Sequence, residues 1–136
     1  MKKVVFILFC TLAIPAIGSH IVGGEFELIH TTGSSYRLNL ILYFDKINGS
    51  PQAKDATVTV RIYGKRNDSF VASLLLSLNQ ESNVGYTQPE CSHGELITSK
   101  LVYTTVLTLS SSQFGDDEGY YVVWERCCRN YGISNI

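Results

Sequence analysis

The chain has 136 residues, a formal net charge of −1 and 45% hydrophobic residues. This hydrophobic content is ordinary for a globular domain and excludes a disordered tail, and the length fits one domain. The near-neutral charge argues against nucleic acid as a partner, because phosphate binding requires a basic surface.

The first 18 residues have the features of a secretory signal peptide. Lys2 and Lys3 form a basic start, residues 4–14 form an apolar run, and small residues follow Pro15 at positions 16–18. This order predicts a signal peptide at 1–18 and a secreted or cell-surface mature chain from residue 19. The apolar run is shorter than the roughly 20 residues that a membrane helix needs, and no other run approaches that length, so no membrane span is expected.

Polar residues alternating with β-branched and aromatic ones dominate the rest of the chain, and helical periodicity is nearly absent. The pattern predicts about seven strands, at residues 21–31, 35–47, 56–66, 70–79, 84–87, 96–110 and 119–136. Strands of this length with turn signals between them indicate an all-β fold, an antiparallel two-layer β-sandwich over residues 19–136.

Local signals refine this prediction. Turn residues at 67–69 predict a hairpin, and a serine at 110–112 is expected to start one helical turn before Gly115. Gly23 and Gly24 are expected to let the first strand bend or bulge where it enters the fold. Alternation predicts the residues that face the core: Phe26, Leu28, Tyr36, Leu38, Leu40, Leu42, Phe44, Val58, Val60 and Ile62.

The stretch IVGG at 21–24 resembles the activated N-terminus of a trypsin-like protease, but the chain lacks the rest of such a site. Acyl transfer needs a nucleophile, a base and a group that orients the base. The histidines are His20, His30 and His93, none lies in an active-site signature, and no serine lies in a GDSGG-like segment. We therefore predict that the chain is not an enzyme, and we expect no catalytic residues and no cofactor.

Two clusters have side chains that could bind metal. Asp116, Asp117 and Glu118 in the stretch GDDEG are weak calcium candidates, because hard oxygen ligands gather there. The spacing is not that of a known calcium loop, and the same residues suit a solvated turn before a strand. A zinc site formed by Cys91 and His93 with the later cysteines is disfavoured, because the later cysteines are adjacent and chelate one ion poorly.

The cysteines that remain after cleavage instead predict a disulfide. In a secreted chain, Cys91 is expected to pair with Cys127 or Cys128. The two neighbours point to opposite faces of a strand, so only one of them can reach Cys91. The other indicates a partner outside this segment, which makes residues 19–136 the N-terminal module of a longer protein.

Tyr121 and Trp124 are candidate ligand-facing aromatics. Aromatic rings on an exposed sheet face can stack on sugars or form interfaces. They therefore suggest an alternative function, a carbohydrate-binding module of a secreted hydrolase. For Trp124 the simpler interpretation is a core residue packed on the disulfide.

Several stretches carry a family resemblance: SHIVGGEFEL, YRLNLILYFD, YTQPECSHGELITSKLVY, GYYVVWERCCRN and ISNI. Together they resemble the N-terminal region of gliding-motility-associated Bacteroidetes proteins, which are large, multidomain and exported by the type IX secretion system. The resemblance covers the whole mature chain. It implies an immunoglobulin-like or cadherin-like sandwich, followed by further modules and a C-terminal sorting domain.

The resemblance also implies a function. We expect a non-catalytic module of a gliding-motility or adhesion protein, with a structural or binding role. Its partners would be downstream domains of the same polypeptide, and extracellular polysaccharide or surface proteins. A calcium-stabilised adhesin domain is a further alternative.

Overall fold

The computed structural model describes residues 21–85, 87–88 and 97–126, and this part of the chain is built from strands. The elements are β1 (Ile21–Thr32), β2 (Ser35–Asp45), the 3₁₀-helix η1 (Pro51–Ala53), β3 (Thr57–Gly64), β4 (Phe70–Asn83), β5 (Thr98–Thr108) and β6 (Tyr120–Val123). The all-β prediction is confirmed. Within the described residues no helix is long and apolar enough to cross a membrane.

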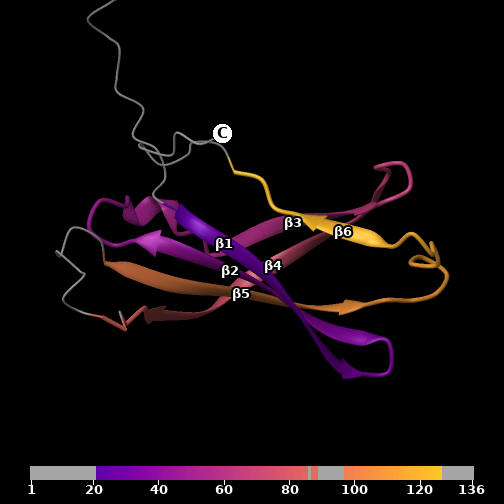
Figure 1. Ribbon diagram of the computed structural model, residues 1–136, viewed down its shortest axis with the longest axis horizontal. Coiled ribbons are helices and arrows are strands. Elements are labelled where there is room, and N and C mark those ends of the chain that lie inside the picture. The colour runs from indigo at the N-terminus through magenta and orange to yellow at the C-terminus, as the bar shows by residue number, and fades with distance from the viewer. Residues whose placement is uncertain (1–20, 86, 89–96, 127–136) are drawn as a thin grey trace, which may run out of the picture.

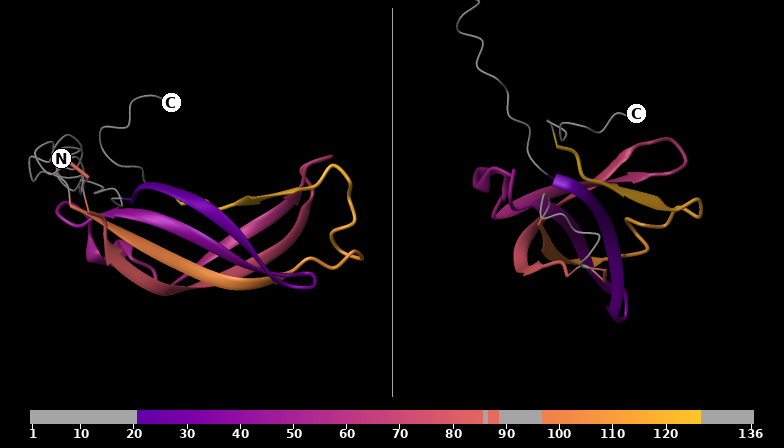
Figure 2. Two further views of the ribbon diagram at one scale, coloured as in Figure 1. Left: turned by 60° about the horizontal axis from the view of Figure 1, so that its bottom comes forward. Right: turned by 60° about the vertical axis from the view of Figure 1, so that its left-hand side comes forward.

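The six strands form one antiparallel sheet in the order β1-β2-β5-β4-β3-β6. Strands β1 and β6 are the two ends of this order. Figure 1 labels the six strands, and Figure 2 shows the sheet curling into a half-barrel. The short strand predicted at 84–87 is absent from the described residues in that range, because β4 continues to Asn83. Val84 adds one backbone hydrogen bond to Thr98 and the strand pairing stops there.

Turn chemistry explains the two tight hairpins. Gly33 turns the chain between β1 and β2 with a φ of 55°, a left-handed conformation that glycine adopts without steric cost. The predicted hairpin at 67–69 joins β3 to β4, where the Asn67 side chain accepts a hydrogen bond from the Ser69 amide. Asp68, with a φ of 54°, takes the left-handed position there.

The concave face of the sheet holds the core. Side chains alternate between faces along each strand, so one set of residues from β2, β3, β4 and β5 meets inside the curl. The predicted inward positions of β2 and β3 are confirmed from Leu38 to Phe44 and from Val58 to Ile62. Burial of each such large side chain contributes about 1.5–3 kcal/mol. The buried hydrophobic cluster is Leu38, Leu40, Leu42, Phe44, Ala53, Val58, Val60, Ile62, Leu76, Leu101, Tyr103 and Leu107.

Strand β1 differs from this pattern. The bulge predicted near Gly23 and Gly24 is present, as a register shift between Ile21 and Gly23. At Gly24 a Cβ would lie 2.8 Å from Leu42 Cδ2 and 3.1 Å from the Ile41 carbonyl oxygen, so a side chain there would displace the buried Leu42 side chain and crowd the backbone of β2. Phe26 faces Leu40 on the concave side, yet it is 39% exposed, because β1 is an edge strand with no described strand beyond it.

The connection from β5 to β6 closes one end of the curl. The amides of Gln113 and Phe114 both donate to the Ser110 carbonyl, which produces the single turn expected before Gly115. Phe114 then contacts Tyr120 edge to face, with ring centroids 5.1 Å apart. Both rings pack against the core cluster, so this turn covers the end of the concave face.

Candidate functional site

An aromatic cluster lies on the convex face, where β3, β4 and β6 meet. Tyr121 in β6 is the direct cross-strand partner of Tyr63 in β3. Their rings stack, with centroids 5.6 Å apart and planes at 21°. Phe70, at the start of β4, meets Tyr63 edge to face at 6.0 Å. We call Tyr63, Phe70 and Tyr121 the outer aromatic cluster.

Register and twist place these rings together. Ile62 and Val122 face the core as a cross-strand pair, so their neighbours Tyr63 and Tyr121 point outward. A bulge between Ile62 and Tyr63 brings Phe70 opposite Tyr63. Phe70 is 58% exposed, although its ring contacts that of Tyr63. The cluster is therefore held by regular strands but remains open to solvent.

A carboxylate fixes one side of the cluster. The Tyr121 hydroxyl donates a hydrogen bond of 2.9 Å to Asp68 in the β3–β4 turn. This hydrogen bond is the main cause that raises the pKa of Tyr121 above its usual value, so the phenol remains a donor. The ring is thus tied to the turn, and its orientation on the convex face is set by two contacts.

The three weak calcium candidates surround a cation from the neighbouring hairpin. Arg66 contacts Asp116 at 2.9 Å, Asp117 at 2.6 Å and Glu118 at 3.3 Å. The hydrogen bond from Arg66 is the main cause that lowers the pKa of Asp116 to about 2. No group of three or more histidine, cysteine, aspartate or glutamate side chains in the described ranges is arranged to hold a metal ion. A calcium ion here would have to compete with the guanidinium.

Trp124 lies on the opposite face from Tyr121. It packs against the core cluster, as expected of a core residue, and it borders a cavity of about 200 Å³. Its expected packing on the disulfide involves cysteines outside the described residues. Tyr121 and Trp124 therefore do not form one ligand-binding surface. The rings that lie beside Tyr121 are those of Tyr63 and Phe70. The other residues that line the cavity are Gly24, Glu25, Phe26, Leu40 and Leu42.

The remaining predicted site residues fall into two groups. Cys91, Cys127 and Cys128 lie outside the described residues, so the disulfide stays a prediction. His30 is the histidine in the described part of the chain, and its Nε2 lies 3.0 Å from the Gly33 carbonyl at a hairpin tip. The IVGG residues form the beginning of β1.

Sequence reasoning missed two members of the cluster. Tyr63 could have been assigned to the convex face from its place next to Ile62 in the alternating pattern. The sequence did not indicate whether Phe70 is exposed, because an aromatic residue directly after a turn is found at the start of both buried and exposed strands. The pairing of β3 with β6 joins residues almost 60 positions apart, and no local pattern encodes it.

Comparison with known proteins adds no relative. No family model, no curated protein and no solved structure matches the chain. Function is therefore inferred from the residues and from their geometry.

Proposed function

We propose that the chain is a secreted, non-catalytic module of a cell-surface or extracellular protein of the gliding-motility or adhesion type. The observation that carries a binding role is the outer aromatic cluster. Folding alone does not require three aromatic rings on the convex face, since the buried hydrophobic cluster lies on the other face. Rigid, half-exposed aromatic side chains are the groups that most often dominate binding surfaces.

Export and the family assignment are the parts of this proposal that rest on the sequence. The basic and apolar start supports secretion, and the stretches from SHIVGGEFEL to ISNI support the gliding-motility class. In that class the partners are downstream domains, extracellular polysaccharide or surface proteins. The proposed role needs no catalytic group.

An immunoglobulin-like or cadherin-like sandwich is the fold type that belongs with this proposal. Its support is the curl of the sheet, which brings inward residues of β2 and β5 against those of β3 and β4 around one core. A sandwich packs two sheets face to face over a shared core. In this proposal the two arms of the single curled sheet, β1-β2-β5 and β4-β3-β6, take the place of those two sheets.

A carbohydrate-binding module of a secreted hydrolase is the second candidate, and the outer aromatic cluster favours it as well. Tyrosine and phenylalanine rings stack on the apolar face of a pyranose, and Asp68 stands beside Tyr121 as a hydrogen-bond acceptor. In this candidate Tyr121 is the ligand-facing residue.

Two binding assays on one set of variants separate these candidates. The purified chain would be mixed with insoluble cellulose, chitin and xylan, and separately with whole cells of the organism that encodes it. Phe70→Ala tests the cluster, and Val106→Ala, which removes a 68% exposed side chain from β5, is the matched control. Cell binding that requires Phe70 supports the surface-protein module. Retention on a pure polysaccharide without cell binding supports the hydrolase module. If the chain binds neither cells nor polysaccharide, both candidates are contradicted.

A further inference from the structure

Strand β1 is a long edge strand, and no other strand in the described part of the chain pairs with its outer side. It has 12 residues and pairs with β2 on one side only. All of it except Ile21 and Ile29 is exposed, whereas its neighbour β2 is buried over most of its length. The other end strand, β6, has 4 residues, so it cannot close the sheet along β1.

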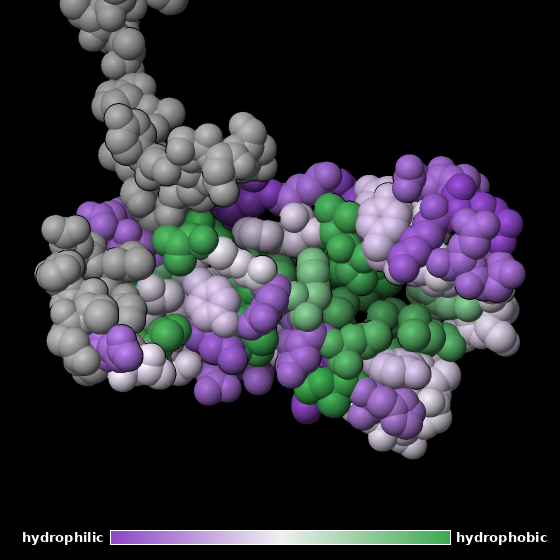
Figure 3. All heavy atoms as spheres, viewed as in Figure 1, coloured by the Kyte–Doolittle hydropathy of each residue, from purple (hydrophilic) through white to green (hydrophobic). Residues whose placement is uncertain are grey.

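Proteins usually protect such an edge with charged side chains, prolines, bulges or a charge that points inward. In β1 the register shifts lie at the two ends of the strand, and its two glutamates point outward. Its middle has no lysine or proline, and the inward positions there carry Phe26, 39% exposed, and Leu28, 51% exposed. Figure 3 shows apolar side chains gathered in the middle of the face that β1 crosses in Figure 1, with hydrophilic side chains around them. The edge therefore offers unpaired backbone groups beside an apolar strip.

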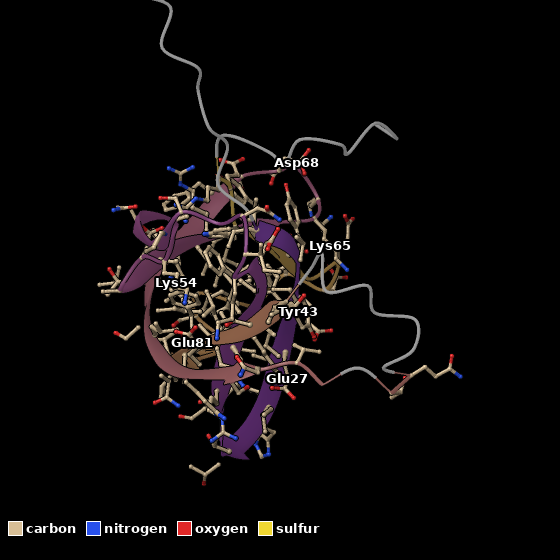
Figure 4. All side chains as sticks on the ribbon, turned by 90° about the vertical axis from the view of Figure 1, so that its left-hand side faces the viewer. Glu27, Tyr43, Lys54, Lys65, Asp68 and Glu81 are labelled. Atoms are coloured by element: carbon tan, nitrogen blue, oxygen red, sulfur yellow. The ribbon has the colours of Figure 1, made fainter. Side chains whose placement is uncertain are left out.

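The outward positions of β1 carry negative charge. Glu25 accepts a hydrogen bond of 2.9 Å from the Tyr43 hydroxyl, and Glu27 accepts one of 2.7 Å from the Asn39 amide. Figure 4 shows Glu27 and Tyr43 on the same side of the sheet. Across the described residues neither glutamate forms an ion pair, and both lean toward β2, which leaves the free edge open.

We propose that β1 binds an extended strand of a partner polypeptide by strand addition, and that this strand alternates apolar residues with lysine or arginine. Its backbone pairs with the free edge of β1, about 4.8 Å away. Its apolar side chains continue the strip of Phe26 and Leu28, and its basic side chains face Glu25 and Glu27. This site is separate from the outer aromatic cluster and does not depend on it.

Charge disfavours a second copy of the chain as the occupant in the register centred on Phe26. In an antiparallel β1–β1 pair centred on Phe26, Glu25 of one copy would face Glu27 of the other on both sides of the pair. Like charges directly opposite each other on paired strands are destabilising. A basic strand places the opposite charge at the same positions.

The test uses the full chain and a fluorescent, capped peptide of about nine residues that alternates valine with lysine. A second peptide has N-methyl groups on the amides of one edge, and a third has glutamate in place of lysine. We expect saturable binding of the first peptide, with amide exchange slowed in β1. Because several backbone hydrogen bonds or charge pairs are lost, the other two peptides should bind more than about tenfold more weakly.

Two protein variants complete the design. Leu28→Lys places a guarding charge on the edge, and Leu75→Lys makes the same change at a 61% exposed leucine of the interior strand β4. Loss of binding in Leu28→Lys alone supports strand addition. Equal binding of the N-methylated peptide, equal loss in both variants, or a β1-dependent homodimer in sedimentation would overturn the proposal.

Discussion

Tyr63 and Tyr121 are stacked cross-strand partners on the convex face, with ring centroids 5.6 Å apart. The residues beside them, Ile62 and Val122, point into the core from the same two strands. One pair of strands therefore supplies both packing and an exposed aromatic surface, and substitutions on the two faces should have different consequences.

The first prediction compares Tyr121→Ala with Trp124→Ala. Trp124 packs on the core, so its removal should lower the free energy of unfolding by about 2–3 kcal/mol. Tyr121→Ala removes a stacking contact on the convex face and should cost only about 0.5–1.5 kcal/mol. Urea unfolding of both variants measures this order. A larger loss for Tyr121→Ala would contradict the assignment of the two faces, and Val106→Ala should stay within about 0.5 kcal/mol of wild type.

The second prediction concerns the loop around Arg66. Arg66→Gln removes the cation that the three carboxylates share, so the pKa of Asp116 should rise from about 2 toward its ordinary value. Titration of the side-chain carboxyl signal by NMR checks this directly. An unchanged pKa of Asp116 in Arg66→Gln would show that the guanidinium does not cause the lowered pKa.

Calcium provides an independent check of the same loop. Because Arg66 occupies the three carboxylates, we expect millimolar calcium to leave the melting temperature of the wild-type chain at its value in EDTA. A rise with calcium that Asp116→Ala abolishes would instead support the calcium-stabilised adhesin.

The third prediction is a pH dependence at Glu81. Lys54 Nζ lies 2.5 Å from Glu81, and the buried Ser99 hydroxyl donates to the same carboxylate oxygen at 2.9 Å. Figure 4 shows Lys54 and Glu81 side by side. The hydrogen bond from Lys54 is the main cause that lowers the pKa of Glu81, so the folded state holds this group charged at lower pH than the unfolded chain does.

When the pKa of a carboxyl is lower in the folded state, the charged group stabilises the protein at any pH above the ordinary pKa of glutamate. This stabilisation is lost as the pH falls through the pKa of the folded state. We therefore expect the urea midpoint to fall on acidification below about 4.5, and to fall less in Glu81→Gln. Glu125→Gln, which removes an exposed carboxylate 3.3 Å from Arg61, is the matched control. Equal acid sensitivity of wild type and Glu81→Gln would refute the role of this group.

The fourth prediction is the disulfide between Cys91 and Cys127 or Cys128. It closes a loop of roughly 36 residues, for which chain entropy gives about 3–4 kcal/mol of stabilisation. Mass spectrometry of the exported chain without reduction should show one of these two linkages. Three free thiols would contradict it.

The alternation of apolar and polar residues predicts which face of a strand a side chain occupies. It does not predict which strands lie beside each other in the sheet. It placed Leu38, Leu40 and Leu42 in the core, because the sequence period of two matches the geometry of a strand. It could not reveal the exposure of Phe26, which follows from the position of β1 at the end of the sheet.

The candidate site shows the same limit. Tyr121 was found from residue type, whereas the contacts of Tyr63 and of Arg66 join segments that are about 50–60 residues apart. Such contacts depend on the order of strands in the sheet. The pattern of any single segment carries no information about that order.

The outer aromatic cluster is, in our proposal, the binding surface of a cell-surface protein. The decisive measurement is the attachment of cells in which the chromosomal gene carries Phe70→Ala with Tyr121→Ala, compared with cells that carry Val106→Ala. Immunoblots of the medium and of the cell surface show that export is equal. We predict that attachment falls at least about tenfold in the aromatic variant, as expected for loss of a binding hot spot, and is unchanged in the control. Normal attachment of the aromatic variant at equal export would contradict the account.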